Sequence, residues 1–130
     1  MTGNNIFLDS NIVIEVFKGN RTISEKIKAF PFVYISVIVL GELYIGINRV
    51  ANKGDHLNKL NSFLDSCIVL DIDQTTSELF GEITASLYKK GKPIPTNDVW
   101  IAATIQQYDL TLVSRDKHFE AVDNILVESW

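Results

Sequence analysis

Short apolar segments alternate with longer amphipathic segments along the whole chain. The apolar segments are rich in β-branched and aromatic residues, as expected of buried strands. The predicted strands are residues 4–9, 32–36, 68–73, 110–114 and 125–129. The segments between them have helical periodicity: in residues 75–91, for example, Leu79, Ile83 and Leu87 fall on one stripe. Strands that alternate with helices predict an α/β sandwich around a mainly parallel central sheet of about four to five short strands.

Capping residues indicate where several of these helices begin. Ser36 directly follows the second predicted strand and is expected to cap a helix that runs towards Asn52. Residues 22–25, with the sequence TISE, have the form of a capping box and predict a helix from there to Phe30. Asp73 is placed to cap the long helix that follows it.

Length and composition indicate one domain, residues 1–130, with 46% hydrophobic and 22% charged residues. No apolar stretch approaches the roughly 18 residues of a membrane span, so no membrane contact is expected. The N-terminus lacks the features of a signal peptide. Cys67 is the single cysteine and cannot form a disulfide within the chain. We therefore expect a cytoplasmic protein.

The net charge of -4 argues at first against a nucleic-acid partner, because phosphate binding usually requires a basic surface. A cluster of acids that binds divalent cations reverses this argument locally, since the loaded cluster is positive. The net charge therefore does not exclude RNA.

Four acidic residues stand near predicted strand ends or at a helix start. Asp9 ends the first strand, and Asp116 follows the fourth by two residues. Asp98 lies in the first turn of a helix that begins after Pro95, and Glu42 lies about two helical turns after the second strand. Ligands of open α/β sheets bind beyond the carboxyl ends of the strands. We therefore expect the four carboxylates to converge there, although a first-turn Asp such as Asp98 is also a common helix-capping residue.

Carboxylates brought so close together repel one another unless cations occupy the site. Their hard oxygen ligands favour Mg²⁺, with Mn²⁺ as a possible substitute. Zinc is a poor fit, because the candidate soft or nitrogen ligands lack the spacing of a zinc site. Those candidates are Cys67, His56 and His118. An acidic site of this kind favours phosphodiester hydrolysis, in which metal activates a water and stabilises the leaving oxygen.

Four stretches together resemble the PIN-domain family, and more narrowly the VapC-like toxins of toxin–antitoxin pairs. They are FLDSNIVIEVF, SVIVLGELYIGI, KGKPIPTNDVWIAATIQQYDLTLVSRDKHFEAV and the terminal VESW. The similarity covers essentially the whole chain. It implies a PIN-like α/β/α sandwich and a Mg²⁺-dependent endoribonuclease that is the toxin of a type II pair.

The resemblance also implies roles for individual residues. The acidic positions of the family carry over onto Asp9, Glu42, Asp98 and Asp116, as catalytic residues and metal ligands. Asn11 resembles an asparagine that supports the ligands, and Ser114 stands where relatives often carry threonine, whose hydroxyl orients an acid.

The implied partners are an RNA substrate, a VapB-like antitoxin and a second copy of the chain. DNA would be contacted only indirectly, through the antitoxin. The apolar stretches on either side of Glu42 also favour a homodimer.

Several neighbouring residues are candidates for lesser roles. Arg115, Lys117 and Lys92 are possible RNA contacts, although a solvated helix end is an equally good interpretation for Lys92. For His118, packing or an RNA contact is favoured over a role as general base, because metal-bound water needs no histidine. Glu15 is expected on a solvated face.

Two other functions remain open on the sequence. A receiver-like signalling domain would take a phosphoryl group on a strand-end Asp, but it needs paired acids, and Asp9 has no acid beside it. A non-catalytic PIN-fold module that only binds RNA or protein would usually lack one or more of the four acids. Metal-dependent cleavage of RNA separates both from a nuclease.

Overall fold

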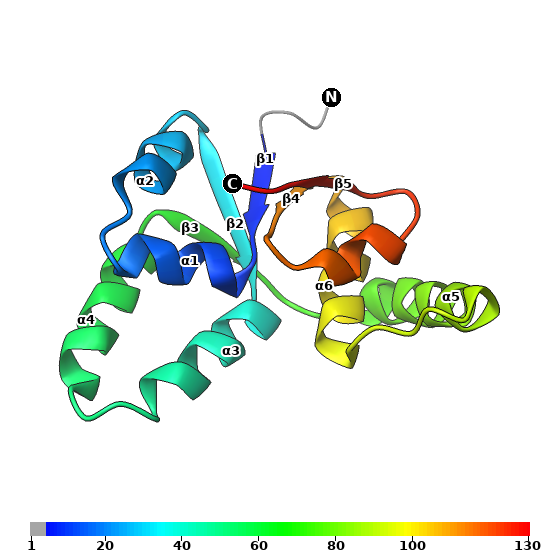
Figure 1. The fold of residues 1–130 in the computed structure, drawn as a ribbon, viewed down its shortest axis with the longest axis horizontal. Helices are drawn as coiled ribbons and strands as arrows, with labels where there is room; N and C mark the ends of the chain where they lie inside the picture. Colours follow the sequence, from blue (N-terminus) through cyan, green and yellow to red (C-terminus); the bar gives the residue numbers. More distant parts are fainter. Residues whose placement is uncertain (1–4) are drawn as a thin grey trace.

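Five short strands, six α-helices and one 3-10 helix make up the part of the chain that the structure describes, residues 5–130 of a computed structural model. Residues 1–4 lie outside it, and with them the first residue of the predicted strand 4–9. The elements, in order, are β1 (Asn5–Leu8), α1 (Ser10–Phe17), α2 (Arg21–Lys28), β2 (Phe32–Ser36), α3 (Val37–Ile47), α4 (Lys53–Leu64), β3 (Cys67–Leu70), α5 (Gln74–Lys90), α6 (Thr96–Tyr108), β4 (Thr111–Val113), η1 (Lys117–Ala121) and β5 (Leu126–Glu128) (Figure 1). The predicted alternation of strands and helices is confirmed.

The strands form one sheet in the order β3-β2-β1-β4-β5, and every neighbouring pair is parallel. In the central strand, Phe7 is paired with Tyr34 of β2 on one side and with Leu112 of β4 on the other. The parallel sheet of four to five strands expected from the sequence is therefore confirmed, with five strands.

The order of the strands changes direction at β1. The chain passes from β1 to β2 and β3 on one side and then returns to place β4 and β5 on the other side. Because parallel crossovers are right-handed, this reversal puts the later helices on the opposite face from the earlier ones. In Figure 1, α1 to α4 gather on the left and α5 and α6 on the right. The carboxyl ends of β1 and β4 therefore border the crevice where ligands of open α/β sheets bind.

The core lies around the central strands and α6. Ile6, Phe7 and Leu8 of β1 are completely buried, and α6 buries Ala102 and Ala103. Small alanine side chains allow this helix to approach its neighbours closely. No helix within residues 5–130 has the length and apolar character needed to cross a membrane.

The helix starts partly agree with the sequence. Asp73 caps α5 in a capping box with Thr76, and the Ser36 hydroxyl accepts the Val39 N–H at the start of α3. The capping box expected at residues 22–25 is wrong: Asn20 caps α2, accepting the Ile23 N–H at 3.2 Å. The helix after Ser36 was expected to run towards residue 52 but ends earlier, at residue 47.

The thiol of Cys67 is half-buried at the start of β3 and donates to the carbonyl of Phe63. Burial raises the pKa of Cys67 to about 11, so it stays protonated at neutral pH.

Candidate active site

Asp9 links the end of β1 to the end of β4. Its backbone N–H donates to the Val113 carbonyl at 3.0 Å, and its Oδ1 accepts the Ser10 N–H at 2.8 Å, which caps α1. Its Oδ2 accepts the hydroxyl of Ser114 at 2.7 Å. The residue is only 4% exposed. The two most central strands therefore hold this carboxylate in a fixed orientation.

Asn11 and Ser114 support Asp9, as the sequence led us to expect of their positions. The Asn11 amide lies 3.5 Å from both Asp9 Oδ2 and Ser114 Oγ, and its oxygen accepts the Arg115 N–H at 3.3 Å. Ser114 Oγ in turn accepts the Asp116 N–H at 3.0 Å. The segment after β4 is thus tied to Asp9 through two side chains.

Asp98 is buried in the first turn of α6, with 6% of its surface exposed. Helix capping does not explain this carboxylate, because the first turn of α6 has Pro95 at the cap position and no side-chain capping bond. Its Oδ2 instead lies 2.9 Å from Nδ1 of His118. The positive end of the α6 dipole still favours the ionised form of Asp98.

Glu42 reaches the same region from α3. Its Oε1 is buried and has no hydrogen-bond partner within residues 5–130. Burial raises the pKa of Glu42, and the charges of Asp9 and Asp98 raise it further, whereas hydrogen bonding of the carboxyl group with the Ser10 and Asn97 side chains lowers it by less. A buried carboxylate oxygen without a donor is costly unless a cation or water occupies the space beside it. The site therefore fits a bound cation.

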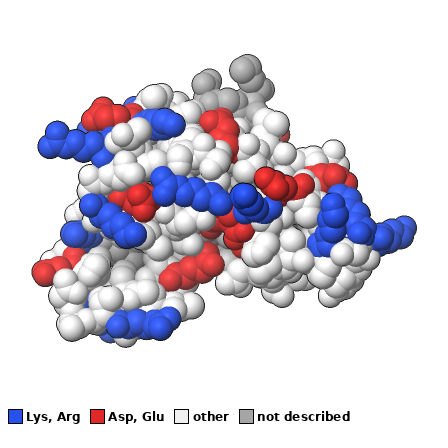
Figure 2. Space-filling model, in the orientation of Figure 1, with Lys and Arg blue, Asp and Glu red and all other residues white. Residues whose placement is uncertain are grey.

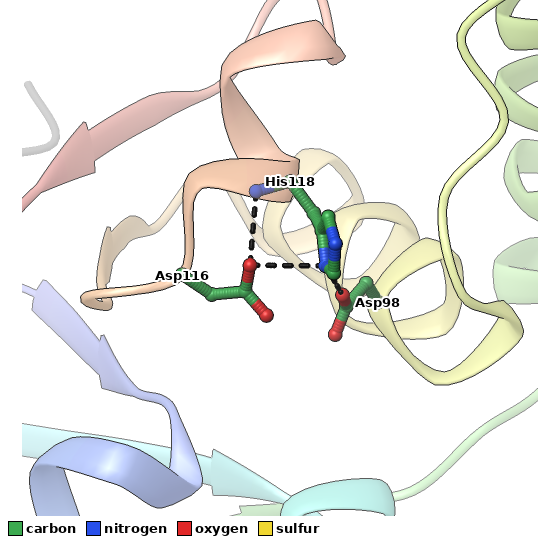
Figure 3. A group of neighbouring side chains, drawn as sticks. All are labelled: Asp98, Asp116 and His118. Atoms are coloured by element: carbon green, nitrogen blue, oxygen red, sulfur yellow. Dashed lines mark hydrogen bonds and ion pairs between the residues drawn. The ribbon is translucent and has the colours of Figure 1, made fainter.

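Asp116, Asp98 and His118 form the outer part of the cluster (Figure 3). His118 Nδ1 lies 2.9 Å from Asp98 Oδ2 and 3.0 Å from Asp116 Oδ1, and the His118 N–H donates to the same Asp116 oxygen at 2.9 Å. One ligand atom from each of the three residues lies within 4.8 Å of the others. Asp98, Asp116 and His118 are thus close enough to share a cation.

The pKa values show that the acids influence one another. Burial raises the pKa of Asp9, against hydrogen bonds from Ser114 and Ser10, and the charge of Asp116 adds to the increase. Burial also raises the pKa of Asp98, against its hydrogen bond with His118, and the charges of Asp116 and Asp9 add to it. Asp98 and Asp116 therefore form a close group with His118, and Asp9 and Glu42 lie near enough for their charges to act on the same acids. Their roles in binding and catalysis stay predictions.

His118 is the residue whose position the sequence reasoning missed. Its side chain is 51% exposed, so the packing interpretation is wrong. The hydrogen bond with Asp98, and then the nearby charges of Asp116 and Asp98, raise the pKa of the imidazole against partial desolvation. Its place two residues after Asp116 is a sequence signal for the contact with Asp116. The contact with Asp98 depends on how α6 packs against η1.

Arg115 and Lys117 stand on either side of Asp116 in the chain, and basic and acidic residues are interleaved on the face shown in Figure 2. Arg115 Nε donates to the Trp130 carbonyl at 2.7 Å, and its Nη1 lies 3.6 Å from Glu15. Glu15 is therefore part of an ion pair, and the prediction of a solvated face is only partly right. Lys117 and Lys92 are exposed.

The comparisons with known proteins agree with this architecture. The sequence matches the PIN domain family over residues 6–125. It is 33% identical to Ribonuclease VapC2 of Haemophilus influenzae over 126 residues, 95% of this chain and 96% of that protein. It is 32% identical to Ribonuclease VapC2 of Rickettsia felis over 118 residues, 90% of this chain and 81% of that protein.

A solved structure has the same fold. The crystal structure of VapBC2 from Rickettsia felis, bound to a DNA fragment from its promoter, contains a chain that superimposes on this one with a TM-score of 0.92. The two chains are 27% identical over 97% of this chain and 98% of that one. With residues 6–125 matched and two relatives above 30% identity, this chain belongs to the PIN domain family, among the VapC ribonucleases.

Proposed function

We propose that this chain is a divalent-metal-dependent endoribonuclease and the toxin of a VapBC-type toxin–antitoxin pair. The observation that carries the proposal is the acidic cluster beyond the carboxyl ends of β1 and β4. It combines two buried aspartates, Asp9 and Asp98, with Glu42, one of whose buried oxygens has no partner within residues 5–130. Relatives that the chain matches over most of its length are named ribonucleases.

The donor set supports Mg²⁺, with Mn²⁺ as a substitute. PIN-domain nucleases are generally dependent on divalent metals, and the group of possible ligands contains Asp98 and Asp116 with His118. Asp9 and Glu42 would add further hard carboxylate oxygens. A divalent cation bound there would make an attacking water more acidic and neutralise charge on the leaving oxygen.

The protein's own residues have separate tasks in this proposal. Asp9 is the anchor, because the central strand and Ser114 fix its orientation. Glu42 and Asp98 complete the ligand set. Asp116 has 29% of its side chain exposed and is therefore the acid best placed to orient an attacking water or to bind a second ion. The water oxygen attacks the phosphorus, and the bond from phosphorus to the leaving ribose oxygen breaks.

The basic residues Arg115, Lys117 and Lys92 are proposed to bind the RNA phosphates. Lys117 and Lys92 are exposed and have flexible side chains, whereas two nitrogens of Arg115 are already engaged by Trp130 and Glu15. We therefore expect Lys117 to contribute more to RNA binding than Arg115 does. An RNA substrate of this kind implies a cytoplasmic enzyme.

The proposed antitoxin would lie along an apolar groove that leads to the acids. Five apolar residues of α1, α3 and the segment after α3 line it, with Glu42 among the lining residues. They are Ile14, Phe17, Leu43, Ile47 and Val50. An apolar segment of a VapB-like partner would fill the groove, and an Arg or Lys beyond it would pair with the carboxylates in place of metal. Contact with DNA would come only through this partner.

A homodimer is also proposed. α3 exposes three apolar side chains: Val37 at 37%, Tyr44 at 37% and Ile45 at 60%. Exposed apolar residues on one helix favour association with a second surface. A second copy of the chain would cover them, as symmetric association is the commonest form of oligomer.

The test is cleavage of a single-stranded or loop RNA by the purified protein. Mg²⁺ or Mn²⁺ should support cleavage and EDTA should abolish it. Asp9→Asn and Asp98→Asn should each reduce the rate by orders of magnitude at saturating metal. Asp73→Asn, which alters the cap of α5, is the matched control and should retain the rate.

Each variant must be folded and monodisperse, so that loss of activity is not loss of structure. If Asp9→Asn and Asp98→Asn both retain wild-type cleavage, the proposal that this acidic site carries out the cleavage is wrong. A wild-type protein that binds RNA without cutting it would favour the alternative of a binding module.

A further inference from the structure

We propose that His118 is a positioning residue that holds Asp98 and Asp116 in the orientation required for cation binding. The inference rests on the proposed function, because it concerns the same acidic site. It adds a residue outside the four acids, and its basis is the geometry around the imidazole.

His118 engages one oxygen of each aspartate and leaves the other. Its Nδ1 lies 2.9 Å from Asp98 Oδ2 and 3.0 Å from Asp116 Oδ1, while its backbone N–H also donates to Asp116 Oδ1. Asp98 Oδ1 and Asp116 Oδ2 remain for other partners. In Figure 3 these two oxygens point to the same side of the site, away from the imidazole. They are therefore oriented as a pair of ligands.

Two carboxylates this close would otherwise separate. One oxygen of Asp98 and one of Asp116 lie 2.9 Å and 3.0 Å from the same His118 nitrogen, so the two ionised carboxylates are close enough to repel one another. An N–H between them offsets that repulsion at short range. Without it, rotation about the side-chain bonds would relieve the repulsion and move the ligand oxygens apart.

The position of the imidazole is itself fixed by the fold. Asp116 caps η1, and His118 lies in this short helix. The next residue, Phe119, is 1% exposed and anchors η1 in the core. The backbone of His118 is thus fixed by η1, so its imidazole can orient the carboxylates of Asp98 and Asp116.

Charge and positioning predict opposite effects of removing the ring. A protonated imidazole would place a positive charge 2.9 Å from Asp98 and 3.0 Å from Asp116 and would repel a cation. If that charge were its main effect, His118→Ala would bind a divalent cation more tightly. If the ring positions the aspartates, His118→Ala binds the cation more weakly.

The first experiment measures binding of Mn²⁺ alone, by electron paramagnetic resonance and calorimetry, to the metal-free full chain. Loss of a group that orients metal ligands typically lowers affinity about 10–100-fold, and we expect His118→Ala to fall in this range. His118→Asn should restore most of the affinity, because its amide nitrogen occupies nearly the place of Nδ1. His118→Gln should not, because its amide nitrogen reaches nearly the place of Nε2.

The control is Glu120→Gln, on the same short helix and exposed, which should bind Mn²⁺ as wild type does. Thermal unfolding in EDTA verifies that each variant is folded. In RNA cleavage, excess Mn²⁺ should recover most of the rate of His118→Ala but not that of Asp98→Asn, because only the latter loses a ligand.

Tighter or unchanged Mn²⁺ binding by His118→Ala overturns the inference, and so does rescue by His118→Gln but not by His118→Asn. These outcomes leave the nuclease proposal intact if the wild type cleaves RNA in a metal-dependent way. A wild type that binds Mn²⁺ with the predicted effect of His118→Ala but cuts no RNA refutes the nuclease proposal alone. A wild type that does not bind Mn²⁺ overturns both.

Discussion

Ser114 donates its hydroxyl proton to Asp9 Oδ2 at 2.7 Å, across 105 positions of the sequence. Ser114 Oγ itself accepts the Asp116 N–H at 3.0 Å. One buried hydroxyl thus connects the acid at the end of β1 to the acid that follows β4. The stability of the sheet and the orientation of two acids depend on the same hydrogen bonds.

Removal of this hydroxyl should affect stability and activity together. Ser114→Ala leaves Asp9 and the Asp116 N–H each without one partner in a buried place, and it should lower the free energy of unfolding by about 1–3 kcal/mol. Urea denaturation measures that change, and RNA cleavage should slow as well. Ser114→Thr keeps the hydroxyl and should retain both properties. If Ser114→Ala is as stable and active as wild type, the hydroxyl does not orient the acids.

Neutralisation of Glu42 should stabilise the metal-free protein at neutral pH. The pKa of Glu42 is raised in the folded state, so its ionisation costs folding free energy. The cost is absent below the ordinary value of 4.5 and develops as the pH rises through the raised pKa. Glu42→Gln in EDTA should therefore melt roughly 2–5 °C higher than wild type at neutral pH. The difference should vanish in acid.

The same melting experiment in Mg²⁺ tests whether Glu42 takes part in metal binding. Mg²⁺ should raise the melting temperature of wild type more than that of Glu42→Gln, because a ligand stabilises only the state that binds it. Equal shifts in the two proteins would show that Glu42 is not part of a metal site.

Lys117 should contribute to RNA affinity rather than to the chemical step. Lys117→Ala should raise the KM for RNA with little change in kcat. The slope of log affinity against log salt concentration should fall by about 0.7–1, as for one phosphate contact. Lys28→Ala is the control, because Lys28 lies on α2 and pairs with Glu25 of the same helix instead of neighbouring Asp116. If Lys28→Ala raises the KM for RNA by as much as Lys117→Ala does, the effect comes from the overall charge of the protein and not from a contact of Lys117.

The apolar groove should be required for inhibition and not for cleavage. Ile14→Asp or Val50→Asp places a charge where the antitoxin segment would pack, at side chains that are 42% and 40% exposed. Loss of one such apolar contact should weaken inhibition by roughly 10–100-fold. The strength of inhibition is measured by titrating the purified VapB-like antitoxin into the cleavage assay. Tyr88→Ala, at an exposed aromatic residue of α5, should leave inhibition unchanged.

The convergence of the acids was predictable because it depends on one rule of sheet architecture. Asp9 directly follows β1, and Asp116 lies shortly after the end of β4. The carboxyl ends of neighbouring parallel strands lie at one edge whatever the details of the helices. The caps Ser36 and Asp73 were predictable for a similar reason, since each directly precedes its helix in the sequence.

Features decided by tertiary packing were not predictable. Asn20 and Thr22 are both good capping residues, and the turn at Gly19, with φ +83°, brings the chain into helix geometry before Thr22 is reached. His118 meets Asp98 only because α6 packs against η1. No local pattern contains that contact.

The sheet order has a consequence for synthesis on the ribosome. β1 is made first, yet its neighbour β4 is made near the end of the described chain, after all six helices. Until β4 emerges, Asp9 lacks the Ser114 hydroxyl, and the loop that carries Asp116 does not yet exist outside the ribosome. An unfinished chain therefore has no assembled acidic cluster. The proposed site therefore forms only after β4 has docked beside β1.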